Sequence, residues 1–311
     1  GETLNAIMFN GGLSRVQNST ANVEFVFADM GDGIDLLSYS STTAGNNVVV
    51  SLALGMASGF TSIKGVENIT GGAGNDTLAG DDNANTIRGG AGADVIMGGA
   101  DGDTLFGEGD DDRFVATVGD GSDSYTGGAG NDTLDLSGTN AGANVNLLAG
   151  TATSTDIGND TLATIENVIG GSGADTFVAS TARNVFTGGL GSDVIVFQTR
   201  QTAGNGAANR DIITDFAHLI DRIDISAIDA DTRNATAANG TQHFIFDGQV
   251  AAGSEAAGHV GFHYEIVGGI EYTVFEGNVR TANNGDTTID FQVALQGHLT
   301  LTSADFIFGT G

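Results

Sequence analysis

The sequence predicts an all-β protein: a parallel β-roll made of short repeats, followed by an antiparallel, β-rich C-terminal region. Residues 71–115 read as five consecutive nonapeptides that begin with glycine, usually carry aspartate sixth and always carry a large apolar residue eighth. The chain has 50 glycines, as a fold with many tight turns requires. From residue 209 onward glycine becomes rarer and aromatic residues increase, in short segments typical of antiparallel strands.

The register of the nonapeptides follows from elementary chemistry. Paired glycines adopt positive φ without a Cβ clash, so the chain reverses tightly at the start of each unit. The last three residues then form a short strand, and alternation along that strand turns the eighth side chain inward. A fixed period of the form G-G-x-G-x-D-x-U-x is typical of a parallel β-roll whose turns bind calcium. The predicted interior residues are Leu78, Ile87, Ile96, Leu105 and Phe114.

Further copies of the repeat follow the first five. After a two-residue break at Ala116 and Thr117, two more copies run over residues 118–135, and a third block covers residues 170–196. Degenerate copies occur at residues 30–38 and 155–163. The sixth-position aspartates of all these copies are Asp35, Asp76, Asp94, Asp103, Asp112, Asp123, Asp132, Asp160, Asp175 and Asp193.

These aspartates indicate calcium as the ligand of the turns. Calcium is a hard cation that takes six to eight oxygen ligands at roughly 2.3–2.6 Å, and one turn supplies too few, so adjacent turns must share each ion. Asn85 and Asn184 replace the aspartate in two copies, where we expect weaker calcium binding or none. The predicted ligands of several Ca²⁺ ions, through backbone carbonyls or carboxylates, are Gly71, Ala73, Asp76, Gly89, Ala91, Asp94, Gly98, Ala100, Asp103, Gly107, Gly109, Asp112, Asp123, Gly127, Ala129, Asp132, Gly170, Ser172, Asp175, Gly188, Leu190, Asp193, Asp35, Asp160, Asp211 and Asp215.

A larger duplication underlies the repeats. The segments NNVVVSLALG (46–55) and GVENITGGAGNDTL (65–78) are echoed about a hundred residues later by ANVNLLAGTA (143–152) and TIENVIGGSGADTF (164–177). Each half therefore contains two longer strands, an apolar Val/Ile-Glu-Asn rung and a run of nonapeptides. This pattern predicts two β-roll segments, stacked on one axis.

Charge narrows the classes of partner. The formal net charge is −29, with 39 acidic against 10 basic residues. Such an excess opposes compaction and argues against nucleic acid or an anionic membrane as a partner. Bound calcium would reduce this repulsion between acidic residues, because each ion carries two positive charges. The chain has no cysteine, so calcium takes the stabilising part that disulfides have in many secreted domains.

Three regions follow from the pattern. Residues 1–69 form a β-rich N-terminal region that includes a degenerate repeat and a predicted strand at Asn22–Ala28. Residues 70–198 form the roll in two blocks, and a polar segment at 199–208 reads as a linker to the C-terminal domain, 209–311. No run of 18 apolar residues and no conventional signal peptide is found in the sequence. The predicted strands of the last domain are FIFDG (244–248), FHYEIV (262–267), EYTVFEG (271–277), IDFQVAL (289–295) and DFIF (305–308).

Two families resemble this sequence. The nonapeptides resemble those of the RTX (repeat-in-toxin) family. Four C-terminal segments, DIITDFAHLIDRIDISAID (211–229), EYTVFEGNV (271–279), IDFQVALQG (289–297) and LTLTSADFIF (299–308), are similar to the C-terminal domain of the serralysin family of secreted metalloproteases. Together these resemblances cover roughly residues 30–308.

The resemblance implies a calcium-binding β-roll, export by a type I (ABC-transporter) secretion apparatus and an uncleaved C-terminal secretion signal. Asp305 to Phe308 match the acidic residue followed by apolar residues near the end of that family. Where the family often has a G-D-x-N/D-G-D-G segment, this chain has NVRTANNGDTTIDF (278–291), so the resemblance gives little support for a calcium site there.

No catalytic motif is found in the sequence. The H-E-x-x-H zinc motif of serralysins is missing, and its nearest imitation, His259-x-x-x-His263, has no glutamate base between the histidines. We expect this pair to be hydrogen-bonded or solvent-facing. The chain has no G-x-S-x-G elbow and no cysteine nucleophile. A carboxylate pair for glycoside chemistry stays open, because 39 acidic residues guarantee accidental pairs.

The sequence therefore predicts a non-catalytic, calcium-dependent folding and type I secretion module of a secreted, extracellular bacterial protein. Two alternatives stay open. One is a structural surface-layer, adhesin or biofilm-matrix protein that self-associates with calcium at the cell surface. The other is the C-terminal part of a secreted enzyme, such as a metalloprotease, lipase or alginate epimerase, whose catalytic domain lies upstream of this segment.

Overall fold

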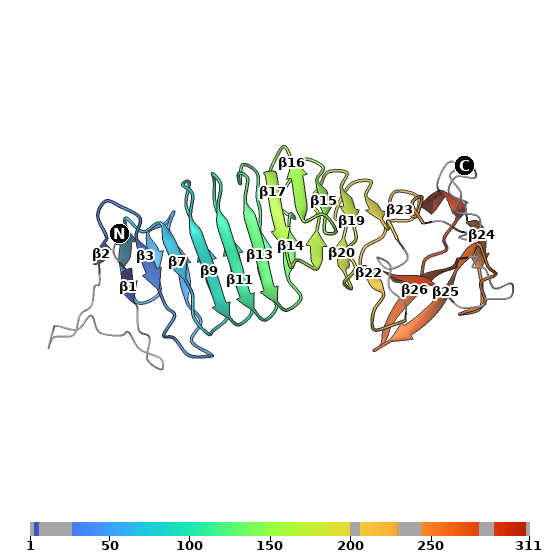
Figure 1. Cartoon of the computed structure of the whole chain (residues 1–311), viewed down its shortest axis with the longest axis horizontal. Helices are drawn as coiled ribbons and strands as arrows, with labels where there is room; N and C mark the ends of the chain where they lie inside the picture. The colour runs from blue at the N-terminus through green and yellow to red at the C-terminus, as the bar shows by residue number, and fades with distance from the viewer. Residues whose placement is uncertain are drawn as a thin grey trace. The chain divides into compact units, whose positions relative to one another are not determined.

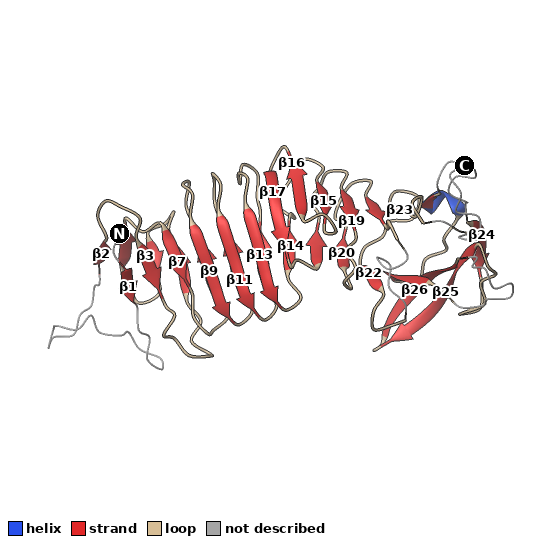
Figure 2. Cartoon of the chain, viewed as in Figure 1, coloured by secondary structure: helices blue, strands red, loops and turns tan. Residues whose placement is uncertain are grey.

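The protein is all-β, as predicted. The computed structural model describes residues 3–5, 27–199, 206–228, 230, 244–279 and 289–308. Within these ranges the chain forms strands and turns, with one short 3-10 helix, η2 (Ser303–Asp305) (Figure 2). The described residues contain no helix long and apolar enough to cross a membrane. Contacts divide the chain into two compact units, residues 1–139 with 150–167 and residues 140–149 with 168–311.

Two facing sheets make up most of the first unit, with successive nonapeptides alternating between them. In each sheet the neighbouring strands run parallel, as the strands from β3 to β13 show in Figure 1, except at the edges, where β16 and β5 pair antiparallel. A separate parallel pair joins β2 (Phe27–Asp29) to β6 (Ser62–Lys64). The first sheet has the order β1 (Thr3–Asn5), β3 (Leu36–Ser38), β7 (Asn68–Thr70), β9 (Thr86–Ala91), β11 (Thr104–Gly109), β13 (Ser124–Ala129), β17 (Gly158–Ala163) and β16 (Thr151–Ser154). The second has the order β5 (Met56–Ala57), β4 (Val49–Ser51), β8 (Thr77–Ala79), β10 (Val95–Met97), β12 (Arg113–Val115) and β14 (Thr133–Asp135).

The strand register records the repeat directly. Leu78 pairs with Ile96, and Ile87 with Leu105, so one full turn of the roll takes two nonapeptides. Leu105 pairs with Tyr125, so the turn that contains Ala116 and Thr117 is longer by that inserted pair. The insertion therefore lengthens one turn without disturbing the pairing of the strands.

The core consists of the eighth-position side chains. Residues seven to nine of each nonapeptide lie in a strand as predicted, although β9, β11 and β13 continue through the first three residues of the next unit. Alternation buries the eighth residue between the two sheets. Leu78, Ile87, Ile96, Leu105 and Phe114 have no exposed surface, which confirms the predicted interior. The ring of Phe114 meets that of Tyr125 edge to face, with 5.6 Å between centroids.

The second unit continues the same architecture and then changes it. One sheet is parallel throughout, and the other passes from parallel roll strands to a long antiparallel meander of β25, β26 and β27. The first sheet has the order β15 (Asn144–Asn146), β19 (Thr176–Val178), β21 (Val194–Val196), β23 (Arg222–Asp224) and β28 (Phe306–Ile307). The second has the order β18 (Asn167–Ile169), β20 (Val185–Thr187), β22 (Asp211–Ile213), β27 (Phe291–Gln296), β26 (Ile270–Asn278), β25 (His259–Val267) and β24 (Ile245–Gln249).

The predicted C-terminal strands are present, but two of them pair differently from the expectation. Strand β24 runs parallel to β25 with a bulge, and β28 runs parallel to β23. Composition indicates where strands lie, whereas their direction depends on which strand each one meets. The predicted strand at Asn22–Ala28 and the predicted linker at 199–208 lie largely outside the described residues. The three-domain division stays a prediction.

Phe114→Ala should strongly destabilise the roll. It removes a fully buried ring that also packs on Tyr125, a loss of about 3–5 kcal/mol for a large core side chain. Urea unfolding in saturating calcium measures the change. Val118→Ala is the control, because Val118 is 55% exposed and should change stability by no more than about 0.5 kcal/mol. Equal losses in both variants would contradict the assigned core.

Candidate calcium-binding turns

Glycine at position one of each repeat leaves room for oxygen atoms. A Cβ at Gly89 would approach Oδ2 of Asp94 and the carbonyl oxygen of Gly107, one full turn onward, closer than 3.0 Å. Such distances are essentially never found for a real Cβ, so a side chain at this position would collide with both atoms. The same crowding with the sixth-position carboxylate occurs at Gly71, Gly98, Gly107, Gly127, Gly170 and Gly188. A carboxylate oxygen therefore lies beside each of these glycines, joined in most copies by a carbonyl oxygen of the next turn.

Only part of the predicted glycine conformation is found. We expected positive φ at both glycines of each pair; in several copies it is found instead at the second and fourth positions, as at Gly90 (116°) and Gly92 (108°), whereas Gly72 and Gly74 do not adopt it. In the copy that begins at Gly107, Glu108 and Asp110 occupy these positions and adopt φ of 79° and 70°. The first glycine is required by lack of space and not by its dihedral angle.

The sixth-position aspartates form a ladder along the roll. Asp94 Oδ1 accepts the backbone N–H of Asp76 (2.7 Å), and Asp112 Oδ1 accepts that of Asp94 (2.8 Å). Asp132 continues the row by accepting from Asp112 (2.8 Å). A second row in the other sheet joins Asn85, Asp103, Asp123 and Asp160 in the same way, and a row in the second unit joins Ala143, Asp175, Asp193 and Asp221. One carboxylate oxygen of each aspartate thus fixes the preceding turn.

The other oxygen is buried and, in several copies, has no partner. Oδ2 has no hydrogen-bond partner among the described residues at Asp94, Asp103, Asp112, Asp132, Asp160, Asp193 and Asp211. Burial raises the pKa of Asp94 and Asp211 to about 8 and that of Asp103, Asp112, Asp160 and Asp193 to about 7, because the charged form loses hydration. For most of these groups neighbouring carboxylates raise the pKa further, whereas Arg183 lowers that of Asp211. Apart from Asp211, these carboxylates therefore form a series for which no positive group lowers the pKa.

A second kind of turn satisfies this oxygen internally. Oδ2 of Asp76 accepts the backbone N–H of Gly72 (2.7 Å), and Oδ2 of Asp175 accepts that of Gly171 (3.0 Å). Asn85 and Asn184 receive the equivalent hydrogen bond on Oδ1, from Asp81 (2.8 Å) and Ser180 (2.8 Å). These turns open the nonapeptide run of each half, and the turns with partnerless oxygens follow them.

The Asp123 turn differs from both kinds. Its Oδ2 accepts a hydrogen bond from the buried hydroxyl of Tyr125 (2.9 Å), which also lies 3.1 Å from Oδ2 of Asp120. Burial, with a contribution from the Asp123 charge, raises the pKa of Asp120 to about 7. Sequence reasoning missed Asp120, because it stands third in its copy and not sixth.

The remaining predicted ligands are placed as follows. Asp35 is buried at the start of the first unit, while Asp215 is exposed and accepts the N–H groups of Gly188 and Gly189 (both 2.8 Å). Asp215 thus caps a predicted calcium turn. The third-position residues Ala73, Ala91, Ala100, Gly109, Ala129, Ser172 and Leu190 are half-buried or exposed on the turns.

Three further acidic residues accept the N–H of a sixth-position aspartate, although they were not among the predicted ligands, and a fourth, Asp305, also directly precedes a short strand. Glu67 Oε2 accepts the N–H of Asp35 (2.7 Å), and Glu166 Oε2 accepts that of Asp132 (2.9 Å). Asp221 accepts from Asp193 (3.0 Å) and precedes β23. Asp305, which has no exposed surface, precedes β28. An acidic residue immediately before a short strand that carries a buried apolar residue is the signal shared by Glu67, Glu166 and Asp221.

The histidines do not form a shared site. Nδ1 of His259 lies 2.9 Å from the Asp247 carboxylate, whereas buried His263 faces Glu276, with 3.5 Å between Nδ1 and Oε1. Among the described residues, no three His, Cys, Asp or Glu side chains are grouped so that they could hold a metal ion by themselves.

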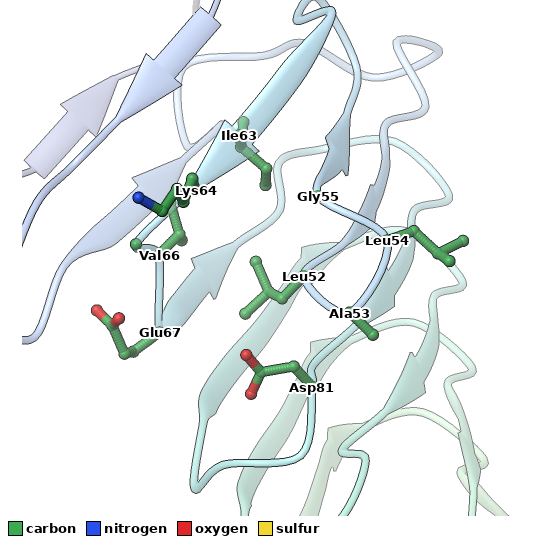
Figure 3. A pocket seen from close by; sticks show the side chains of 10 residues that line it. Leu52, Ala53, Leu54, Gly55, Ile63, Lys64, Val66, Glu67 and Asp81 are labelled. Atoms are coloured by element: carbon green, nitrogen blue, oxygen red, sulfur yellow. The ribbon is translucent and has the colours of Figure 1, made fainter.

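A cavity of about 340 Å³ lies beside the roll in the first unit (Figure 3). Leu52, Ile63, Val66 and the charged residues Lys64, Glu67 and Asp81 contribute to its lining. None of the predicted calcium ligands lines it, although Glu67 and Asp81 both contact Asn85.

The donor set of the turns fits calcium. The available ligands are oxygens only, which suits a hard cation. Partnerless carboxylate oxygens lie beside position-one glycines where a Cβ would not fit, several of them close to a carbonyl of the adjacent turn. A divalent cation supplies the positive charge that these buried carboxylates lack.

Comparisons with known proteins agree with this geometry. Residues 64–96 and 88–120 match the RTX calcium-binding nonapeptide repeat, a family of four-copy repeats. Residues 123–308 match the peptidase M10 serralysin C-terminal family. No curated protein matches the chain.

Two similar solved structures are subunits of a mannuronan C5-epimerase from Azotobacter vinelandii. The AlgE6 R3 subunit is 22% identical, with a TM-score of 0.30, and the match covers 65% of this chain and 80% of that subunit. The AlgE6 R2 subunit is 20% identical, with a TM-score of 0.32, and the match covers 66% and 92%. The serralysin match spans more than half of this chain, and the protein therefore belongs to the peptidase M10 serralysin C-terminal family and carries RTX calcium-binding repeats.

Proposed function

We propose that this chain is a non-catalytic, calcium-dependent folding and type I secretion module of an extracellular bacterial protein. The observation that carries the proposal is the series of buried sixth-position carboxylates whose Oδ2 atoms lack a partner among the described residues. A buried charge without a counterion is strongly unfavourable, so the folded roll needs a cation or protons at these positions.

The ions would be held at the turns of Asp94, Asp103, Asp112, Asp132 and Asp193, with backbone carbonyls from adjacent turns completing each site. Bound calcium would neutralise the carboxylates and link two turns of the roll. The residues of this chain supply the rest. Glycine at position one keeps the space open, and the Oδ1 ladder holds each carboxylate in a fixed orientation. Because calcium binds the folded turns and not the unfolded chain, its binding free energy stabilises the fold.

The charge of the chain supports a link between folding and export. At a net charge of −29, mutual repulsion keeps the calcium-free chain extended and suited to passage through a transporter. Folding then begins where calcium is plentiful, outside the cell. Membership of a family named after secreted proteases, together with RTX repeats, supports a secreted, extracellular location.

The C-terminal motif supports the same order of events. Asp305 accepts hydrogen bonds from the N–H groups of Leu219 (2.9 Å) and Thr302 (2.7 Å), and its carboxylate lies 2.8 Å from Nδ1 of His218. Asp305 and Phe306 are buried in the folded unit. A secretion apparatus could therefore read this motif only before folding, and folding outside the cell would withdraw it.

Within this proposal, residues 1–69 lead into the roll, residues 70–198 bind calcium, and residues 209–311 form the capping and secretion domain. Self-association with calcium, as a surface-layer or matrix protein would show, is the outcome that would replace the export role. An upstream catalytic domain is compatible with the module and would be its cargo.

Light scattering coupled to size-exclusion chromatography tests the proposal directly. In EGTA the chain should be expanded. In about 10 mM calcium it should be a compact monomer, because this concentration exceeds the dissociation constants of about 10⁻⁴–10⁻³ M typical of extracellular calcium modules. Large assemblies in calcium would favour the structural role. A compact chain in both buffers would contradict calcium-dependent folding.

Asp94→Ala combined with Asp112→Ala should raise the calcium midpoint of folding by about tenfold or more, equivalent to at least about 1.4 kcal/mol. The two aspartates are neighbours in one row, so their loss removes adjacent shared sites. A calcium titration followed by circular dichroism gives the midpoint. The matched control is Asp32→Ala with Asp82→Ala, which removes two exposed turn aspartates outside position six. Equal midpoints for the two double variants would contradict shared sites.

Protons should partly replace calcium. The carboxylates of Asp94, Asp103, Asp112 and Asp193 have folded-state pKa values of about 7–8, against about 3.9 in the unfolded chain. A raised pKa means that the folded state binds the proton more tightly, so stability in EGTA should increase as pH falls from 8 toward 4. Circular dichroism in EGTA at pH 8 and pH 5 tests this. More β-structure at pH 8 than at pH 5 would show that the assigned burial of these carboxylates is wrong.

A further inference from the structure

The two asparagine turns differ from the aspartate turns in how their polar atoms are used. Asn85 is buried, its Oδ1 accepts the N–H of Asp81 (2.8 Å), and its Nδ2 donates to the carbonyl oxygen of Glu67 in the preceding turn (2.7 Å). In the aspartate rows the connection to the preceding turn runs the other way, with Oδ1 accepting a backbone N–H. The amide thus links two turns without a charge and without leaving an oxygen unsatisfied.

Asn68, the residue after Glu67, makes the Glu67 carbonyl oxygen available to the Asn85 amide. In an ordinary rung the sixth-position carbonyl accepts a strand N–H of the next turn, as Asp76 does from Val95 (2.9 Å). Here the N–H of Thr86 donates instead to the side-chain Oδ1 of Asn68 (2.8 Å). The Glu67 carbonyl is therefore left to the Asn85 amide, and an aspartate at residue 85 would place one acceptor against another.

The backbone pairing at the start of this arrangement recurs in the second half of the duplication. The N–H groups of Glu67 and Asn68 both donate to the Asp35 carbonyl (3.2 and 3.0 Å), and those of Glu166 and Asn167 both donate to the Asp132 carbonyl (3.1 and 2.9 Å). In each half, an asparagine stands at position six, two nonapeptides after the glutamate: Asn85 after Glu67, and Asn184 after Glu166.

The Asn184 turn, unlike the Asn85 turn with Gly80 at position one, lacks the space that the aspartate turns keep open. Its Oδ1 accepts the N–H of Ser180 (2.8 Å), and its Nδ2 donates to the Ser180 hydroxyl (3.0 Å). Position one is Ala179, which is fully buried, where the aspartate turns of its block have Gly170 and Gly188. At those glycines a Cβ would lie closer than 3.0 Å to the sixth-position carboxylate. In the other turns the carboxylate oxygens lie beside an empty position-one site. In this turn the methyl group of Ala179 fills that site.

We propose that the Asn85 and Asn184 turns are metal-free rungs, in which the asparagine amide takes the place of a calcium ion. The inference rests on the proposed function, since it requires that the aspartate turns bind calcium. Each half of the roll then has one rung that closes through a neutral amide, ahead of the turns with partnerless carboxylates, and the chain binds fewer ions than it has nonapeptides.

Calcium stoichiometry in site-directed variants tests the inference. Asn85→Asp should bind one more ion per chain than the wild type, measured by equilibrium dialysis and elemental analysis. Asn83→Asp is the matched control, because it adds the same charge at an exposed position in the same turn and should add no ion. Asn184→Asp should gain an ion only when combined with Ala179→Gly. An unchanged count in Asn85→Asp, or an equal gain in Asn83→Asp, would overturn the proposal.

A measurement on the wild type does not depend on whether the variants fold. Anomalous diffraction from calcium-loaded crystals should show ions beside Asp94 and Asp112, and none between the Glu67 carbonyl and Asn85. An ion at the Asn85 rung would overturn the inference while leaving the proposed function intact. A wild-type chain that binds no calcium in dialysis would instead overturn the proposed function.

Discussion

The fold depends on one arrangement: a buried carboxylate held between two turns of the roll. One of its oxygens fixes the N–H of the preceding turn, and in many copies the other is enclosed without a partner among the described residues. Glycine at position one is required because any Cβ there would strike the carboxylate. The same carboxylates that order the turns thus make the calcium-free fold unfavourable, which couples folding to a cation.

The apolar interior contributes to the fold in a different way from the carboxylates. Each nonapeptide contributes one large buried side chain, and the two sheets share a narrow core of such residues. This core sets the register, because a shift of one residue would turn the eighth side chain to the outside. This core is also small, because each short strand buries little more than one side chain. The roll therefore combines a thin hydrophobic core with electrostatic links at its edges.

Departures from the repeat are informative because the repeat is so regular. The insertion at Ala116 and Thr117 lengthens one turn of the roll, and the Tyr125 hydroxyl satisfies Asp123 in the turn that follows. Glu67 and Glu166 replace aspartate at the boundary of each half and still accept the expected N–H. In the second unit, Asp221 and Asp305 keep the acidic position before β23 and β28, although the nonapeptide pattern has ended.

The repeat pattern was enough to predict the all-β class, the short strands at positions seven to nine and the buried eighth residues such as Ile96 and Phe114, because a strict period leaves one register that buries every large apolar side chain. It also indicated calcium and the row of sixth-position aspartates. Other features became apparent only in the folded chain: the parallel pairing of β24 and β28, the part that Glu67 and Glu166 take as acceptors in the aspartate rows, and the division between turns with satisfied and partnerless carboxylates. These features depend on which backbone N–H or hydroxyl group reaches an oxygen from another turn, and that is a property of contacts between residues far apart in the chain.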